Sequence, residues 1–185
     1  ELDDIYLSGY WQSELYFKDI REQILRLYTF PIQLDYMNGV FLRKIENSNS
    51  VSIHIRRGDY LNENNLKIYG NICTLNYYNK ALQIIAKKIT NPIIFVFTND
   101  IEWVRKELEI PNMVIVDCNS GKLSYWDMYL MSKCKANIVA NSSFSWWGAW
   151  LNKNENRIII SPKRWLNNHE QTSTLCDNWI RCGDD

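Results

Sequence analysis

The sequence has no apolar run that approaches the ~20 residues of a membrane-spanning helix, and it shows no signal peptide. Internal repeats and low-complexity tracts are also missing. The 21 basic and 21 acidic residues give a formal net charge of zero. This balance argues against a protein that binds nucleic acid through a broadly basic surface, so any anion site must be local.

Several short signatures are absent as well. There is no Gly-x-Gly-x-x-Gly and no Gly-Lys-Ser/Thr, which argues against a classical dinucleotide fold and a phosphate-loop kinase. No Asp-x-Asp motif suggests a metal-bound diphosphate, and we expect no metal and no cofactor. The 5 cysteines include no Cys-x-x-Cys pair, which predicts reduced thiols in a cytosolic protein. A bridge between Cys176 and Cys182 is the alternative.

The composition is otherwise that of a folded domain. Hydrophobic residues make up 46% of the 185 residues, enough to bury the core of one domain, or of one domain and part of another. The chain begins at Glu1 rather than Met, and we expect it to be a piece of a longer protein.

The first part of the chain predicts a helix and then a boundary. Residues 13–28 have Ser13 as a plausible N-cap and an apolar stripe at Phe17, Ile20, Ile24 and Leu27. The polar stretch 47–50 then interrupts the pattern. We therefore expect residues 1–49 to be a helical remnant of an N-terminal domain or a linker, and residues 50–185 to be a Rossmann-like domain.

The second part alternates between strands and helices. Apolar, β-branched runs occur at 51–55, 93–97, 113–116, 138–140 and 158–160. Helical patterns separate them: one begins near Thr74 with an apolar face at Leu75, Tyr78, Leu82, Ile85 and Ile89, and others cover 100–108 and 122–135. This alternation predicts a doubly wound α/β fold, with a parallel sheet covered by helices on both faces. Ligands of such sheets bind at the carboxyl ends of the strands.

The first expected strand runs directly into charged residues. His54 and Arg56 should share one face of the strand, and Arg57 should take the other. Gly58 permits a sharp turn that lets Asp59 fold back. Two guanidinium groups at this edge could clamp a diphosphate, because arginine offers a planar fork. The alternative is a structural salt bridge between Asp59 and one of the arginines.

Another strand feeds the start of an aromatic helix. The polar residues at this junction are Asn141, Ser142, Ser143 and Ser145. A helix start leaves backbone N–H groups free, and these groups and the helix dipole can bind phosphate. Simple helix capping is the alternative for the serines. Core packing is the alternative that we favour for the three tryptophans of this helix, Trp146, Trp147 and Trp150.

A third polar group, Thr98-Asn99-Asp100, follows the strand at 93–97. It could hold a base or a ribose at the ligand edge. Equally, Asp100 could cap the helix that carries Trp103.

Together these segments resemble the bacterial alpha-1,2-fucosyltransferase family. The matching stretches are Tyr6-Leu-Ser-Gly-Tyr-Trp-Gln-Ser13, His54-Ile-Arg-Arg-Gly-Asp-Tyr60, Phe97-Thr-Asn-Asp-Ile-Glu-Trp103 and Asn141-Ser-Ser-Phe-Ser-Trp-Trp-Gly-Ala-Trp150. The resemblance implies a two-domain GT-B fold, of which this chain would be the C-terminal, donor-binding half. It also implies metal-independent transfer of fucose from GDP-β-L-fucose to the 2-hydroxyl of a galactoside, with inversion.

The resemblance assigns roles to the residues already singled out. Arg56 is the first candidate for the diphosphate contact and Arg57 the second. The other donor-binding candidates are Asn99, Asp100, Asn141, Ser142, Ser143 and Ser145, with Asp100 near the nucleoside. Apart from the resemblance, the reaction needs a general base, for which our hypothesis takes Asp59 as the first candidate and His54 as the second, although the base could also lie outside this chain.

Two features depart from the family pattern. The Gly-Gly-Leu-Gly-Asn-Gln-like stretch that usually opens the family is absent, and Thr98-Asn99-Asp100 stands where Ser-Asp-Asp is expected. The expected partners are GDP-fucose and a galactose-containing glycan, and the expected location is the cytoplasm, with peripheral association with the inner membrane as an option. The competing interpretations are another sugar-nucleotide donor, a non-catalytic nucleotide- or glycan-binding domain, and a structural domain.

Overall fold

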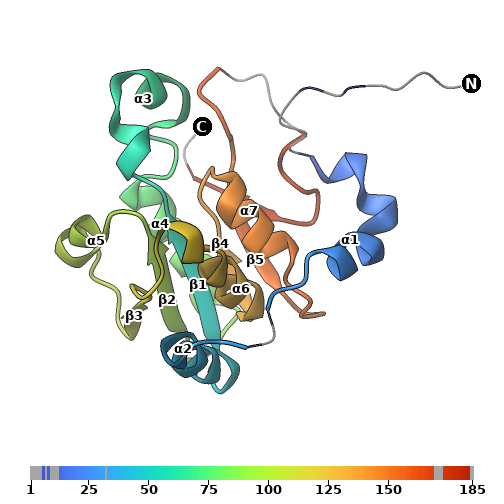
Figure 1. Cartoon of the computed structure of the whole chain (residues 1–185). Coiled ribbons are helices and arrows are strands. Elements are labelled where there is room, and N and C mark those ends of the chain that lie inside the picture. Colours follow the sequence, from blue (N-terminus) through green and yellow to red (C-terminus); the bar gives the residue numbers. More distant parts are fainter. Residues whose placement is uncertain (1–5, 7, 9–12, 32, 169–172, 184–185) are drawn as a thin grey trace, which may run out of the picture.

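The computed structural model describes residues 6, 8, 13–31, 33–168 and 173–183. The described residues form one six-stranded parallel sheet in the order β3-β2-β1-β4-β5-β6 (Figure 1). The strands are β1 (Ser50–Ile55), β2 (Ile93–Thr98), β3 (Met113–Ile115), β4 (Ala136–Ile138), β5 (Ile158–Pro162) and β6 (Ile180–Cys182). The predicted α/β class is confirmed. The sequence did not predict β6, and β4 begins two residues earlier than the predicted 138–140.

Helices cover both faces of the sheet, as predicted (Figure 1). They are α1 (Arg21–Leu27), α2 (Tyr36–Glu46), α3 (Glu63–Tyr69), α4 (Leu75–Ala86), α5 (Ile101–Glu107), α6 (Tyr125–Lys133) and α7 (Ser143–Trp150). Short 3-10 turns occur at η1 (Glu14–Tyr16), η2 (Lys18–Ile20), η3 (Gly58–Leu61) and η4 (Gly121–Leu123). Helices α4 and α5 pack on one face through a core that includes Tyr77 and Val104. Helices α2 and α6 pack on the other through Phe41 and Leu130.

Polar side chains fix where several helices begin. The Thr74 hydroxyl accepts a hydrogen bond from the Tyr77 amide at the start of α4, as the sequence predicts. Asp35 caps α2 in the same way through the amide of Asn38. The helix predicted at 122–135 begins only at Tyr125, because Gly121 has a positive φ of 53° and residues 121–123 form a 3-10 turn.

The prediction of one continuous helix over residues 13–28 is wrong. Ser13 does act as a cap, since its hydroxyl accepts from the Leu15 amide, but Phe17 leaves the helical region at φ −147°. The Phe17 ring stacks on Trp147 with their centroids 5.6 Å apart, so a tertiary contact decides the local backbone. Leu27 is 75% exposed instead of buried. Of the family-like stretch 6–13, residues 7 and 9–12 lie outside the described residues.

The tryptophans of α7 are packing residues, as favoured from the sequence. Trp146 and Trp150 are buried, and Trp147 stacks on both Phe17 and Tyr28. Through these contacts the segment before α2 is held against α7.

The segment before residue 50 also belongs to a covering layer of the sheet. The polar stretch at 47–49 forms a turn between α2 and β1. Phe41 and Ile45 of α2, however, are buried in the same cluster as Phe95 and Phe97 of β2. The division of the chain into domains at residues 49 and 50 stays a prediction.

A buried polar network joins the central strands to α6. The Asn137 amide of β4 donates to the Ser52 hydroxyl at 2.7 Å and to the Met131 carbonyl at 2.8 Å. Its oxygen accepts from the Asn152 amide at 2.8 Å. Asn152 is fully buried just beyond α7. The network therefore connects β1, β4, α6 and the end of α7 without leaving the Asn137 side chain unpaired.

All five cysteines lie in the described part of the chain and are free thiols. Cys176 lies in the tryptophan-rich cluster around α7, whereas Cys182 lies in the core on the α4 side of the sheet. The alternative of a bridge between them is therefore wrong.

The order of the strands creates a switch point. From β1 the chain builds β2 and β3 on one side, and it then crosses back to build β4, β5 and β6 on the other. Strands β1 and β4 are thus adjacent, with Val51 paired to Ala136 and Ile53 to Ile138. In parallel sheets the crevice at such a reversal, beyond the carboxyl ends of the strands, is where ligands bind.

Candidate functional site

A pocket of about 460 Å³ opens at the carboxyl ends of β1 and β4. It brings together two of the segments singled out in the sequence. The lining residues are Arg56, Asp59, Tyr60, Asn65, Tyr69, Asn141, Ser142, Ser143, Phe144, Trp165 and Leu166. The residues after β1 and the start of α7 therefore share one rim of the sheet, as the sequence predicts.

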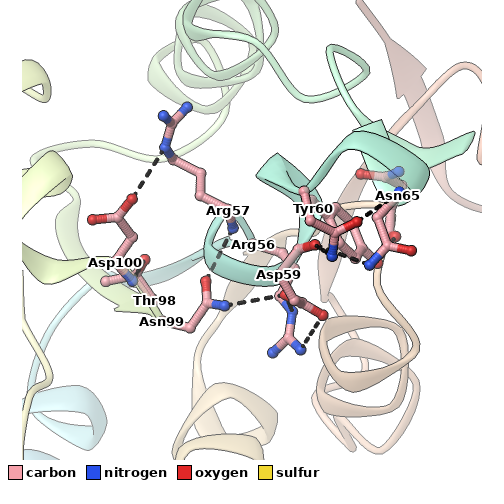
Figure 2. Close-up of polar contacts among 10 residues, drawn as sticks. Arg56, Arg57, Asp59, Tyr60, Asn65, Thr98, Asn99 and Asp100 are labelled. Atoms are coloured by element: carbon pink, nitrogen blue, oxygen red, sulfur yellow. Dashed lines mark hydrogen bonds and ion pairs between the residues drawn. The ribbon is translucent and has the colours of Figure 1, made fainter. Parts of the chain in front are cut away.

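The Arg56 guanidinium lines this pocket and makes a two-pronged contact with Asp59, which we call the Arg56 fork. Its Nε lies 2.7 Å from Asp59 Oδ1, and its Nη2 donates to Asp59 Oδ2 at 2.8 Å (Figure 2). The side chains remain 34% and 44% exposed, so the pair is accessible from the pocket. Two parallel bonds to a carboxylate use the same geometry by which arginine binds two oxygens of a phosphate. Arg56 is thus oriented to hold an oxyanion.

The pKa of the Asp59 carboxyl is lowered below its ordinary value. Burial alone would raise this pKa, but the hydrogen bonds and the charge of Arg56 outweigh burial, and Asn99 adds a further hydrogen bond. A carboxylate with a lowered pKa is a poor proton acceptor. While it is paired with Arg56, Asp59 is held as a counter-ion.

His54 lies behind the pocket and does not line it. Its side chain is buried against the ring of Phe144, and its Nδ1 has no hydrogen-bond partner among the described residues. Burial, followed by the charge of Arg56, lowers the pKa of His54 to about 3. The imidazole is therefore neutral at neutral pH and a poor acceptor for a proton.

Arg57 points to the other face of the sheet, as strand alternation predicts (Figure 2). Its Nε lies 3.3 Å from Asp100 Oδ2, and its guanidinium stacks over the Trp103 ring at 4.2 Å. Asp100 also accepts from the Trp103 amide and so caps α5. Of the two alternatives that the sequence left open for Asp100, the structure shows the helix cap. The ion pair between Arg57 and Asp100 was not predicted. Neither side chain lines the pocket.

Asn99 connects the two neighbouring strand ends. Its Oδ1 accepts from the Arg57 backbone N–H at 3.0 Å, and its Nδ2 donates to Asp59 Oδ1 at 3.3 Å (Figure 2). A Cβ at Gly58 would lie only 2.7 Å from that Nδ2. A side chain at 58 would therefore displace the Asn99 amide, and glycine leaves that amide room to reach Asp59.

The start of α7 supplies the other wall of the pocket. Ser142 is the N-cap residue in extended conformation, and its side chain makes no capping hydrogen bond. Ser143, the first helical residue, is exposed and lines the pocket with Phe144. The first-turn amides and the positive end of the helix dipole therefore lie on the same pocket as Arg56, an arrangement suited to an anion.

Two other predicted donor-binding residues, Ser145 and Asn141, form hydrogen bonds within the protein. The Ser145 hydroxyl is buried and hydrogen-bonds with the backbone N–H of Ala140 at 3.2 Å. The Asn141 side chain donates to the carbonyls of Tyr69 and Trp165 at 3.0 and 3.1 Å. The structure thus occupies both side chains with bonds that hold the turn before α7 and the pocket walls.

Sequence reasoning missed the wall formed by η3 and α3. Tyr60 donates its hydroxyl proton to the Asn141 carbonyl at 2.9 Å and stacks on Tyr69, with ring centroids 5.0 Å apart. Trp165, which lies just beyond the carboxyl end of β5, completes the pocket. The available signals were the position of Trp165 after an apolar strand and that of Tyr60 in the family-like stretch 54–60, because α3 is short and carries no clear apolar stripe.

A larger hollow of about 680 Å³ lies between α1, the end of α2 and the end of α6. Its lining includes Lys133, the last residue of α6, and Lys135, which directly precedes β4. This is the amino end of the strands, where parallel sheets do not place their ligands. Within the described residues, no group of three or more His, Cys, Asp and Glu side chains could hold a metal. No helix in that part of the chain is long and apolar enough to cross a bilayer.

Comparison with known proteins identifies the family. Residues 3–182 match the family model described as Glycosyl transferase family 11, and the chain belongs to this family. It is 36% identical over 181 residues to WbnK of Escherichia coli, an O-antigen biosynthesis glycosyltransferase. It is 39% identical over 181 residues to an alpha-1,2-colitosyltransferase of Escherichia coli.

These two alignments include 94% of this chain but 59% and 61% of the relatives. The chain thus spans about three fifths of the length of these relatives. A galactoside alpha-(1,2)-fucosyltransferase 1 of Leontopithecus chrysomelas is 27% identical over 154 residues, which are 78% of this chain and 42% of that protein.

Proposed function

We propose that this chain binds the donor of a glycosyltransferase that uses a sugar nucleotide. The whole protein would transfer L-fucose from GDP-fucose to the 2-hydroxyl of a galactoside with inversion. One observation carries the proposal: the Arg56 fork and the start of α7 line a single pocket at the switch point of the sheet. Relatives named as an alpha-1,2-colitosyltransferase and a galactoside alpha-(1,2)-fucosyltransferase support the type of linkage.

In this proposal the pocket stabilises the leaving diphosphate. Its oxygens take the place of the Asp59 carboxylate in the fork of Arg56, and the amides at the start of α7 bind the remaining charge. Fixed donors aimed at developing charge are effective catalysts, and losing one such donor typically costs ~2.7–4 kcal/mol of transition-state stabilisation. These groups would neutralise the leaving group without a metal.

The exchange of partners also prepares a base. Once the diphosphate occupies Arg56, Asp59 loses the hydrogen bonds to Arg56 that lower its pKa, keeps the bond from Asn99, and becomes a better proton acceptor. The acceptor hydroxyl oxygen then forms its bond to the anomeric carbon on the face opposite the breaking carbon–oxygen bond of the diphosphate. The hydroxyl proton passes to Asp59, and GDP leaves with the bonding electrons. Burial and a pKa of about 3 make His54 the weaker candidate.

A matched pair of variants tests the proposal. In calorimetric titrations of the chain with GDP, Arg56→Lys should bind at least about tenfold more weakly than wild type, because lysine has no bidentate fork. Arg57→Lys should stay within about threefold, because the Arg57 guanidinium lies on Trp103 and outside the pocket. UDP should bind more weakly than GDP. Equal GDP affinity of wild type and Arg56→Lys would refute the diphosphate role of Arg56.

A second donor is favoured by one specific comparison, since the relative at 39% identity is named as a colitosyltransferase. Transfer assays on the complete gene product with GDP-fucose and GDP-colitose separate the two candidates by which sugar appears on the acceptor. In either case Arg56→Ala should abolish transfer and leave the fold intact.

A further inference from the structure

Asn99 does not line the pocket, yet both ends of its amide are used next to it. The Arg57 backbone N–H can only donate, so it fixes Oδ1 of Asn99 on its side. The Nδ2 group must then face Asp59, where it donates to Oδ1 at 3.3 Å. The orientation of the amide is therefore determined by the protein.

The bond to Asp59 continues to Arg56. Asp59 Oδ1 accepts from both Asn99 Nδ2 and Arg56 Nε, while Asp59 Oδ2 accepts from Arg56 Nη2 (Figure 2). The carboxylate is thus held on two sides, by an amide from the end of β2 and by a guanidinium from the end of β1. A chain of hydrogen bonds leads from Asn99 through Asp59 to the fork at the pocket.

The Asn99 amide occupies the space that a side chain at position 58 would fill. A Cβ at position 58 would lie 2.7 Å from Nδ2 and 3.4 Å from Cγ of Asn99. The Asp59 carbonyl accepts from the side-chain amides of Asn62 and Asn65, at 2.7 and 2.9 Å. The loop that carries Asp59 is therefore fixed against the amide, and a change at position 99 acts directly on the carboxylate.

We propose that Asn99 is a positioning residue of the diphosphate site, which holds Arg56 ready at the pocket by fixing Asp59. The proposal rests on the proposed function, because it gives Arg56 the role of binding the diphosphate. An aspartate at position 99 would direct a second negative charge at Asp59.

If Asn99 has this role, GDP binding by the isosteric variant Asn99→Asp should depend on pH. Two carboxylates at this distance raise the pKa of one of them, so the pair repels at high pH and shares a proton at low pH. The charged groups nearby are Arg56 and Asp59 in the site, and Arg57 and Asp100 on the α5 side. They are present in wild type and variant alike, so the ratio of the two affinities isolates the new carboxylate.

The test is GDP binding by calorimetry in wild type, Asn99→Asp and Asn99→Ala, at about pH 8 and about pH 5.5. Asn99→Asp should bind about tenfold more weakly than wild type at the higher pH and recover to within about threefold at the lower. Asn99→Ala should show a smaller loss, about threefold, and a ratio to wild type that does not change with pH. Thermal unfolding checks that each variant is folded.

Equal affinity of Asn99→Asp and wild type at the higher pH, or a deficit independent of pH, overturns the positioning role. If Arg56→Lys also binds like wild type, or wild type does not bind GDP, the proposed function fails and the role of Asn99 fails with it. If only Arg56→Lys is impaired, the function stands and the positioning role is lost. Should Asn99→Asp not fold, the test is instead the pKa of Asp59, measured by NMR in wild type and Asn99→Ala. This pKa should rise in Asn99→Ala, and an unchanged value refutes the proposal.

Discussion

Arg56 and Arg57 are neighbours in the sequence and have opposite environments. Strand alternation predicted that they would face different sides of the sheet, and the structure confirms this. Alternation could not say which arginine faces the ligand edge. That choice depends on Trp103 and Asp100, which bind Arg57 from α5. The sequence thus predicts that the two arginines face opposite sides, but not which of them reaches the pocket. That depends on partners that follow another strand.

The buried imidazole of His54 predicts how stability varies with pH. Its pKa is about 3 in the folded chain and 6.5 ordinarily, so below pH 6.5 the unfolded chain takes up the proton first. The free energy of unfolding therefore carries no penalty from His54 above pH 6.5, and it falls as the pH is lowered below that value. Between about pH 7.5 and about pH 5.5 this residue should cost about 1.4 kcal/mol of unfolding free energy.

Urea unfolding of wild type and His54→Gln at these two pH values measures the effect. The variant should show a smaller loss of stability on acidification, by about 1.4 kcal/mol. Burial raises the pKa of Asp127 to about 7, so this residue makes the protein more stable as the pH falls. It is present in both proteins, and its effect cancels in the comparison. Identical losses in the two proteins would show that His54 does not titrate as described.

At the scale of secondary-structure elements, α7 and β4 depend on a polar network inside the core. Asn137 uses its amide for Ser52 and Met131 and its oxygen for Asn152. Asn137→Leu removes all three bonds and leaves buried polar partners unpaired. It should lower the free energy of unfolding by about 2–4 kcal/mol, since each unsatisfied buried group costs about 1–3 kcal/mol.

Urea denaturation compares this variant with Asn64→Leu, the same substitution at an exposed position of α3. The exposed change should stay within about 0.5 kcal/mol of wild type. Similar effects of the two substitutions would mean that the buried network contributes nothing to the stability of these elements.

The same asparagine explains one limit of sequence-based prediction. Strand β4 was expected over the apolar run 138–140, whereas the strand includes Asn137, whose polar side chain is satisfied by hydrogen bonds. The apolar strands β1 and β2 were located to within one residue. The helix over 13–28 failed for a related reason, because contacts of Phe17 with the tryptophans of α7 outweigh the local pattern. Local patterns predict elements where burial is apolar and regular, and they fail where a distant partner decides.

At the scale of the whole molecule, the order of the strands puts the site where it is. The doubly wound class was predictable from alternating strands and helices, and the class implied that chemistry lies at the carboxyl ends. The order β3-β2-β1-β4-β5-β6 was not predictable from local patterns, yet it is what makes β1 and β4 neighbours. It thereby joins Arg56 to the start of α7 in one pocket.

The most direct test of this arrangement is a crystal structure of the chain with GDP bound. We expect the diphosphate in the pocket at the ends of β1 and β4, with phosphate oxygens within hydrogen-bond distance of the Arg56 guanidinium and the Ser143 amide. Phosphates bound elsewhere, with Arg56 still paired to Asp59 and no contact to α7, would contradict it.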